Sequence, residues 1–312
     1  MALTLADHAL QHDNLFAQGI VKILDEESPI MKWLTFKTIN GDAYKWREEI
    51  GLPGVQYRGV NENYLESTGT IGAKYAGLYL LGGDMFMDNY LLRTQGQGAG
   101  TFDHERTQME MKARAMNREI SRAFLEGDNL ADPDEPSGLR QALPASQTLL
   151  AATNGGPITP GLLDQLIDMV IPGNLHFFMG PLNRRNLTQS MLQGGSAATY
   201  QITYGDVDSM GEQTVRYGGV PIHIIRDTGS GTGILGFDEV AGSSSLTSSV
   251  YLVNFDDDKV FGIFNGDGPP IEVRRLGEDF GSPGHKYRVE FFWNWILKHP
   301  RGAARLRGVT AA

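Results

Sequence analysis

Residues 52–69 read LPGVQYRGVNENYLESTG, and strand-like sequence lies on both sides of them. Before this stretch, Tyr44 and Trp46 alternate with polar residues, and residues 75–81 form a second strand-like run after it. The pattern predicts a long hairpin over residues 36–80. Its tip has too few aliphatic residues for a core of its own, and loops of this length are uncommon unless they have a role. We expect the tip to rest on another domain or molecule; a solvated, flexible loop is the alternative.

A long helix is predicted downstream of the hairpin, over residues 103–126. Apolar side chains recur there at steps of three and four, with Arg and Glu on the remaining faces. The stripe consists of Met109, Ala113, Met116, Ile120 and Phe124. Gly127 is the expected stop. More than twenty helical residues span about 30 Å, so this helix is expected to be a spine against which strands pack.

The rest of the chain predicts an α+β protein. A helix is expected from Pro160, a buried strand at 176–180 and a second helix at 181–192. Strand-like runs follow, at 218–227, 248–264, 269–279 and 287–300. Ahead of the hairpin, an amphipathic stretch at 15–24 fits a helix on an N-terminal arm. The chain is therefore expected to enter one body through the spine helix, visit a second body and return to the first.

Composition excludes several classes of protein. The 312 residues contain no cysteine, which rules out disulfides and thiolate chemistry, and no segment approaches the roughly 20 apolar residues of a membrane span. The 27 basic and 37 acidic residues give a net charge of −10, which argues against gripping phosphate backbones as a main task. Four basic residues near the C-terminus are expected to neutralise acidic neighbours: Lys298, Arg301, Arg305 and Arg307.

One motif invites a catalytic reading. Residues 224–231, IIRDTGSG, contain the Asp-Thr-Gly of aspartic proteases at Asp227. Those enzymes need two such aspartates face to face, and this chain has one. A homodimer would supply the second, but Arg226 stands where such enzymes bury an apolar side chain. We interpret Asp227 as part of a turn between two strands, the second beginning near Ile234.

Other candidate sites are weak. The triplet Asp256–Asp258 lacks the following ligand and glycine of a calcium loop and is interpreted as a turn between strands. His8 and His12 are spaced to share a helix face, but two ligands alone make a poor metal site. The other histidines, at positions 104, 176, 223, 285 and 299, are scattered along the sequence. The sequence therefore predicts no catalytic residue, no metal site and no cofactor.

The order of these elements resembles the major capsid proteins of tailed bacteriophages. The resemblance rests on LPGVQYRGVNENYLESTG within a long hairpin, the spine helix, GVPIHIIRD, ILGFDE and the closing HPRGAARLRGV, and it runs from about residue 30 to the end. It implies a capsid fold that tailed phages share with encapsulin compartments and the floor of herpesvirus shells. An encapsulin-like compartment is therefore the alternative function, and an aspartic protease through Asp227 is a remote one.

The resemblance also implies a division of the chain. The regions are an N-terminal arm (1–35), an extended loop (36–80), a peripheral domain (81–149 and 265–300) and an axial domain (150–264 and 301–312). The extended loop is expected to lie across an adjacent subunit through Pro53, Tyr57, Arg58, Asn61, Glu62, Tyr64 and Leu65. A peripheral-domain loop is expected to meet its equivalents through Glu278, Asp279, His285 and Lys286.

The implied function is a structural one. Many copies would form hexamers and pentamers that close into an icosahedral shell around double-stranded DNA, held without sequence-specific binding. A scaffolding protein encoded as a separate chain, a portal and a decoration protein are the further candidate partners, and no membrane is expected. The protein would be assembled in the bacterial host cytoplasm and would reside in the virion.

Overall fold

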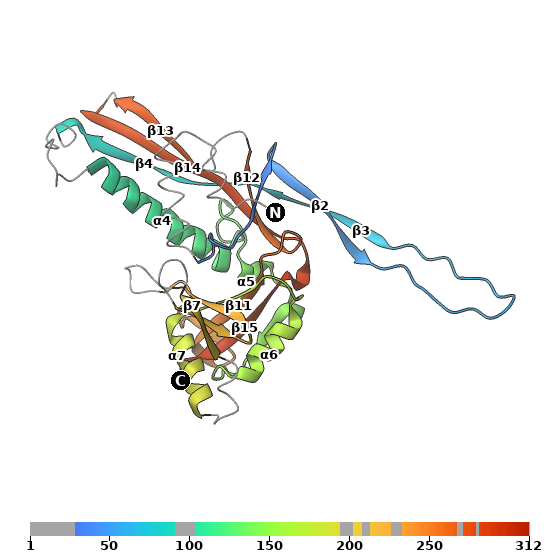
Figure 1. Ribbon diagram of the computed structural model, residues 1–312. Coiled ribbons are helices and arrows are strands. Elements are labelled where there is room, and N and C mark those ends of the chain that lie inside the picture. Colours follow the sequence, from blue (N-terminus) through green and yellow to red (C-terminus); the bar gives the residue numbers. More distant parts are fainter. Residues whose placement is uncertain are drawn as a thin grey trace.

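The computed structural model describes residues 29–90, 104–193, 202–207, 213–225, 233–266, 271–278 and 281–311. It contains two sheets with covering helices and a two-stranded hairpin that projects far from both (Figure 1). The predicted amphipathic stretch at 15–24, His8, His12, Asp227 and Asp279 lie outside the described residues. None of the described helices is long and apolar enough to cross a membrane.

The first sheet is built around one long strand, β14 (Gly284–Leu297). The other four strands are β1 (Phe36–Ile39), β4 (Tyr79–Asp88), β12 (Val260–Asn265) and β13 (Ile271–Glu278). Strand β4 pairs along one edge of β14, whereas β13 and β12 share the other edge. Alternate residues of β14, among them Val289, Phe291 and Trp293, are buried, as period-two geometry requires of a sheet covered on one face.

The spine helix is confirmed as α4 (His104–Glu126). The whole predicted apolar stripe, from Met109 to Phe124, is buried, and α4 runs alongside β4 and β14 (Figure 1). The helix ends before Gly127, as expected. A side chain at Gly127 would collide with the carbonyl oxygens of Pro136 and Ala123, so the close return of the chain at this point requires glycine.

The second sheet has eight strands. These are β5 (Thr148–Leu150), β6 (Leu175–Met179), β7 (Ile202–Val207), β8 (Gln213–Tyr217), β9 (Val220–Ile224), β10 (Glu239–Ala241), β11 (Ser244–Asn254) and β15 (Ala303–Thr310). The predicted helices are present as α6 (Pro160–Met169) and α7 (Pro181–Gln193), and shorter helical turns occupy α5 (Leu139–Ala142), η1 (Ala145–Gln147) and η3 (Pro300–Gly302). The C-terminal strand β15 lies inside this sheet, between β5 and β11.

The sequence of strand β6, LHFFM, does not alternate between apolar and polar residues, and its burial explains why. Phe177 and Met179 face the core that α6 and α7 share with the sheet, whereas Phe178 faces the opposite core. Both faces of the strand are therefore buried, which removes the polar alternation of a half-exposed strand. The predicted buried strand at 176–180 is confirmed.

The core that contains Phe178 joins the two sheets. Phe124 of α4 contacts Phe255, which follows β11, and Trp295 of β14, with ring centroids 6.3 and 5.0 Å apart. The N-terminal residues Ile30, Met31 and Leu34 are buried in the same cluster. Within the expected arm (1–35), these three residues are therefore part of the core, and residues 1–28 lie outside the described part of the chain.

The hairpin consists of β2 (Ala43–Gly51) and β3 (Thr70–Gly77), which pair from Ala43–Gly77 to Gly51–Thr70. This confirms the predicted hairpin. Its base is held on the first sheet, where Tyr44 and Trp46 pack against a small buried cluster that includes Phe261 and Ile296. Strand β1, at the start of the 36–80 range, belongs to the first sheet instead.

One strand expectation was wrong. Residues 233–237 form no strand; they make a turn in which Ile234 and Leu235 are buried in the core between the sheets. The side chains of these two residues cover part of that core from an irregular segment, and the next strand, β10, begins at Glu239. The predicted turn at 256–258 is confirmed, but it connects β11 and β12, which lie in different sheets.

Candidate inter-subunit surfaces

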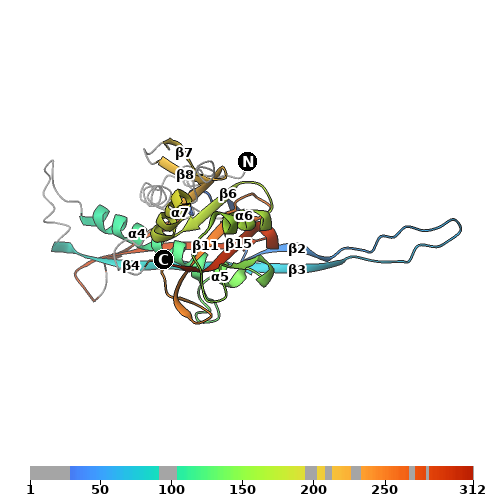
Figure 2. The same ribbon diagram turned by 90° about the horizontal axis from the view of Figure 1, so that it is seen from below.

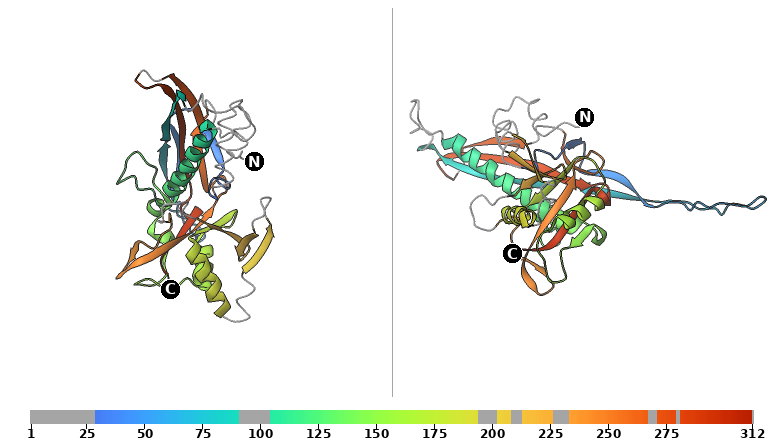
Figure 3. Two further views of the ribbon diagram at one scale, coloured as in Figure 1. Left: turned by 90° about the vertical axis from the view of Figure 1, so that its left-hand side faces the viewer. Right: turned by 60° about the horizontal axis from the view of Figure 1, so that its bottom comes forward.

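The loop that connects β2 and β3, residues 52–69, touches no other part of the body in any view (Figures 1, 2 and 3). All its residues are exposed, and Tyr64 and Leu65 expose 63% and 77% of their surface. Large apolar side chains gather on the loop and the adjoining strands: Ile50, Leu52, Val55, Tyr57, Val60, Tyr64, Leu65, Ile71 and Tyr75. Exposed apolar clusters of this kind usually mark a surface that another molecule covers.

Local contacts hold the tip of this loop in shape. The Gly59 N–H donates to Oε2 of Glu62 at 2.8 Å, and the Arg58 guanidinium donates to the Glu62 carbonyl at 3.1 Å. The same guanidinium lies 5.1 Å from the ring of Tyr64. Asn61 occupies the turn with φ of 69°, a left-handed conformation that asparagine tolerates well. Of the predicted contact residues, the structure thus brings Arg58, Glu62 and Tyr64 together.

Lower down the loop, the two sides are linked. The Gly54 N–H donates to Oγ of Ser67 at 2.6 Å, and Pro53 lies opposite Gly69, where a side chain would touch its ring. A loop ordered before binding loses less conformational entropy when a partner covers it. The geometry therefore suits an interaction arm better than an unstructured excursion.

The peripheral loop lies at the far end of the first sheet. Glu278 and His285 are opposite each other in the β13–β14 ladder, and Oε1 of Glu278 accepts a hydrogen bond from Nδ2 of Asn89 at 2.9 Å. Lys286 lies 3.4 Å from a carboxylate oxygen of Asp84. The described members of this predicted set are therefore close together, and Glu278 and Lys286 also have side-chain partners within their own chain.

Sequence reasoning missed Asp84. The guanidinium of Arg288 donates to both of its carboxylate oxygens, at 2.7 and 3.0 Å. These bonds, together with Lys286, lower the pKa of Asp84 to about 2. Asp84 and Arg288 are opposite each other on antiparallel strands 204 residues apart, so only the strand register could have shown the pair.

No protein-family model matches the sequence, and no curated protein matches it either. Solved structures do match. The SrpI encapsulin of Synechococcus elongatus PCC 7942 gives a TM-score of 0.66 at 14% identity, over 91% of this chain and 89% of that chain. A chain of Microbacterium phage Oxtober96 gives 0.63 at 13% identity, over 91% and 90%. The capsid of the native GTA particle gives 0.61 at 12% identity, over 90% of each chain.

The chain has the capsid fold of tailed phages and encapsulins. The fold class inferred from the sequence is thereby confirmed. These similarities extend over about nine tenths of both chains, so the capsid fold accounts for the hairpin, the spine helix and both sheets together.

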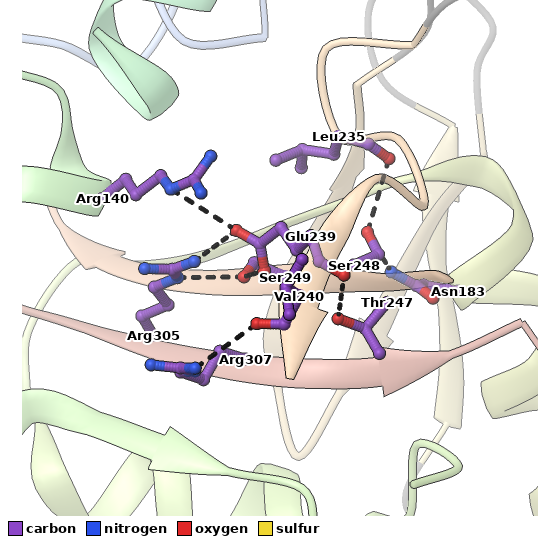
Figure 4. Close-up of polar contacts among 10 residues, drawn as sticks. All are labelled: Arg140, Asn183, Leu235, Glu239, Val240, Thr247, Ser248, Ser249, Arg305 and Arg307. Atoms are coloured by element: carbon purple, nitrogen blue, oxygen red, sulfur yellow. Dashed lines mark hydrogen bonds and ion pairs between the residues drawn. The ribbon is translucent and has the colours of Figure 1, made fainter. Parts of the chain in front are cut away.

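Behind the surfaces of this capsid fold, the eight-stranded sheet contains a buried polar cluster (Figure 4). Glu239 of β10 and Arg305 of β15 form an ion pair and are only 6% and 8% exposed. Ser249 of β11 donates to Glu239 at 2.6 Å and accepts from Nε of Arg305 at 2.9 Å, and Nε of Arg140 lies 3.8 Å from the same carboxylate. The cluster fixes the short strand β10 on β11 and β15.

This cluster tests the prediction for the C-terminal basic residues. Arg305 pairs with Glu239 and Lys298 pairs with Asp258, as predicted. The other two have backbone partners: Arg301 donates to the carbonyl of Met169 at 3.2 Å, and Arg307 donates to the carbonyl of Val240 at 3.5 Å. Arg301 thus interacts with the carbonyl groups at the C-terminal end of α6, where a cation is favourable.

Two histidines that the sequence separates are neighbours in this fold. His176 of β6 and His223 of β9 stand on adjacent parallel strands, with Nδ1 and Nε2 2.9 Å apart. These two histidines are 47 residues apart in the sequence, and only the fold brings them together. Among the described residues, no three His, Cys, Asp or Glu side chains converge as a metal site requires.

A cavity of about 520 Å³ lies at the base of the hairpin. Its lining includes Trp46 and Tyr75 from the hairpin, Asn294 from β14 and the Lys74–Glu48 ion pair. Nδ2 of Asn294 donates to the carbonyl of Gly77 at 2.6 Å and so ties β14 to the end of β3. These contacts position the hairpin on the sheet.

Proposed function

We propose that this chain is the major capsid protein of a tailed bacteriophage, a structural protein without enzymatic activity. The observation that carries the proposal is the ordered apolar loop 52–69, which no other described part of the chain covers. A shell built from one repeated chain needs contacts that close by symmetry, and a reaching arm supplies interface area without a larger core. When all neighbouring subunits are counted, each reaching segment is expected to bury at least about 1,600 Å² of surface, the size of a standard protein interface.

The assembly follows from this role. Copies form hexamers and pentamers in which the extended loop lies across an adjacent subunit and the peripheral loop meets its equivalents. The peripheral domain comprises the first sheet and α4. The axial domain comprises the eight-stranded sheet with α6 and α7. The N-terminal arm is assigned to the residues that precede residue 29. A separate scaffolding protein, a portal and a decoration protein are the proposed partners, and assembly takes place in the host cytoplasm.

The net charge of the chain is also compatible with a shell that encloses DNA. A net charge of −10 disfavours tight binding of phosphate backbones, so packaged double-stranded DNA is held by enclosure without sequence-specific contacts. An encapsulin-like shell around enzyme cargo is the second candidate, favoured by the similarity to the SrpI encapsulin. Nucleic acid inside particles purified from infected cells supports the phage capsid, and protein cargo without nucleic acid supports the compartment.

The association state tests both candidates together. We expect the full chain, expressed alone or with its scaffold, to elute as capsomers or far larger shells in size-exclusion chromatography with light scattering. Negative-stain electron microscopy should then show closed particles. A strictly monomeric species at high concentration, under conditions that preserve the fold, contradicts the proposal.

A further inference from the structure

The sequence contains three Asn-Gly pairs, at residues 40–41, 154–155 and 265–266. An asparagine followed by glycine readily loses its side-chain amide, because glycine has no side chain to hinder the attack of its backbone nitrogen on the asparagine side chain. Both Asn40 and Asn265 are followed by Gly-Asp. Their local sequences therefore give these two asparagines nearly the same intrinsic reactivity, and the fold decides which of them reacts.

The fold protects the glycine nitrogen in two of the three pairs. The Gly266 N–H donates to the carbonyl of Ile39 at 3.0 Å, and Asn265 lies opposite Ile39 in the parallel ladder of β1 and β12. The Gly155 N–H donates to the carbonyl of Ala152 at 3.0 Å. A nitrogen held in such a bond must be released by local opening before it can attack, which slows the reaction.

The pair Asn40 and Gly41 lacks this protection. With Asp42, these residues form an exposed bend that connects β1 to β2, outside the ladders of both strands. Within the described part of the chain, the Gly41 N–H donates to no acceptor. Gly41 has φ of 126°, a conformation that favours glycine, and a side chain there would touch nothing within 4 Å. The nitrogen therefore has no hydrogen bond to break and open space around it.

We propose that Asn40 is a site of spontaneous modification, at which a carboxylate replaces the side-chain amide in the folded protein. The Gly41 nitrogen, after losing its proton to the solvent, attacks Cγ of Asn40. A cyclic imide forms, and the side-chain nitrogen leaves as ammonia with a proton from water. Water then adds to either carbonyl of the ring and opens it, which gives aspartate or isoaspartate. Water is the only co-reactant that the sequence of steps consumes.

The place of this site in the fold gives the modification a structural effect. Both products add a negative charge to the bend between the first sheet and the hairpin, beside Asp42. Isoaspartate also lengthens the main chain by a methylene. The carbonyl of Asp42 accepts a hydrogen bond from the Leu78 N–H at 3.3 Å, which links the bend to the far strand of the hairpin. Isoaspartate at position 40 loosens this link, whether or not the chain forms a shell.

Peptide mapping by mass spectrometry tests the site. The full chain is incubated at pH 7.5, folded or unfolded in urea, and conversion of the peptides that contain Asn40, Asn154 and Asn265 is followed over time. In the folded chain, Asn40 should convert about tenfold faster than Asn265, a factor that one net backbone hydrogen bond accounts for. In urea the two rates should converge, because the residues that follow are the same. Equal rates in the folded chain, or an Asn40 that stays intact there while the unfolded chain is modified, overturn the proposal.

The products and their pH dependence test the mechanism. The imide gives isoaspartate together with aspartate, which fragmentation distinguishes, whereas direct hydrolysis of the amide gives aspartate alone. Conversion should be faster at pH 7.5 than at pH 5.5, because the Gly41 nitrogen attacks only after losing its proton. Asn40→Gln should abolish conversion at this position and leave circular dichroism unchanged, since a longer side chain closes the ring poorly. Aspartate as the single product, or a rate that does not rise with pH, overturns the proposal.

Hydrogen exchange separates the added charge from the added methylene. Protein aged until most copies contain isoaspartate is compared with the variant Asn40→Asp, which has the charge and an ordinary main chain. We expect a peptide that contains Leu78 to exchange faster in the aged protein than in the variant, while a peptide from β14 exchanges equally in both. Equal exchange of the Leu78 peptide would show that the longer main chain does not loosen the hairpin.

Discussion

The Glu239–Arg305 pair shows what a single buried contact does in this protein. Each side chain has a charged partner and shares the Ser249 hydroxyl, so both charges are compensated inside the sheet. Removal of one partner leaves the other buried without compensation, which costs far more than loss of an exposed ion pair. The pair therefore affects stability mainly because either charged side chain, left buried without the other, would destabilise the fold.

Glu239→Ala should destabilise the fold by about 3–5 kcal/mol, measured by urea unfolding. The matched control Arg140→Ala removes the half-exposed cation 3.8 Å from the same carboxylate and should cost less than about 1 kcal/mol. Replacement of both partners, as Glu239→Leu with Arg305→Met, should recover much of the loss. Equal costs for the two single variants would show that the buried charge is not the cause.

At the scale of elements, the hairpin divides into a base and a tip. Tyr44 and Trp46 pack the base onto the first sheet, whereas residues 52–69 contact no other part of the body. The strands already face each other at Gly51 and Thr70, so the tip can be removed without disturbing the pairing below it. Loop-closure entropy changes slowly with loop length, and the shorter hairpin should form as readily.

Replacement of residues 52–69 by Asn-Gly should leave circular dichroism and unfolding nearly unchanged and should prevent closed particles, seen by electron microscopy. A finer variant keeps the loop and changes Tyr57, Tyr64 and Leu65 to serine; its control is Leu130→Ser, an exposed apolar residue elsewhere. If shells form as readily without the tip, the tip is a solvated loop with no role in assembly. Collapse of the fold would assign the tip to the core.

At the scale of the whole molecule, one core joins the two sheets. It contains Phe124 from the spine helix, Phe255 beside the eight-stranded sheet and Trp295 from the five-stranded sheet. The two parts therefore share buried surface and should unfold together. The same core buries the turn at residues 30–34, which ties the N-terminal region to both.

Phe124→Ala should cost about 3–5 kcal/mol, because the cavity it leaves is surrounded by aromatic rings from both sheets. Urea unfolding should remain a single transition, and hydrogen exchange should quicken in β11 and β14 alike. The matched control, Met111→Ala on the exposed side of the same helix, should change stability by less than about 0.5 kcal/mol. Two separate transitions would show that the sheets are independent domains.

Local periodicity in the sequence was enough to predict several of the elements. The stripe from Met109 to Phe124 defines α4, the apolar run at 176–180 defines β6, and the alternation at Tyr44 and Trp46 defines one side of the hairpin. Each of these patterns depends on neighbours within a few residues, because period 3.6 or 2 decides which side chains share a face. The seven loop residues were named from the resemblance to capsid proteins, and their role between subunits remains a prediction.

Only the tertiary structure decided which distant side chains meet. His176 and His223 are 47 residues apart, Glu239 and Arg305 are 66 apart, and Asp84 and Arg288 are 204 apart. Each pair meets because two strands are neighbours in a particular order and register, and neither is encoded in the periodicity of either strand. For the same reason the order of elements along the sequence predicted a capsid-like chain with a long loop, whereas strand order and packing between the sheets decided where its buried charges and its histidine pair lie.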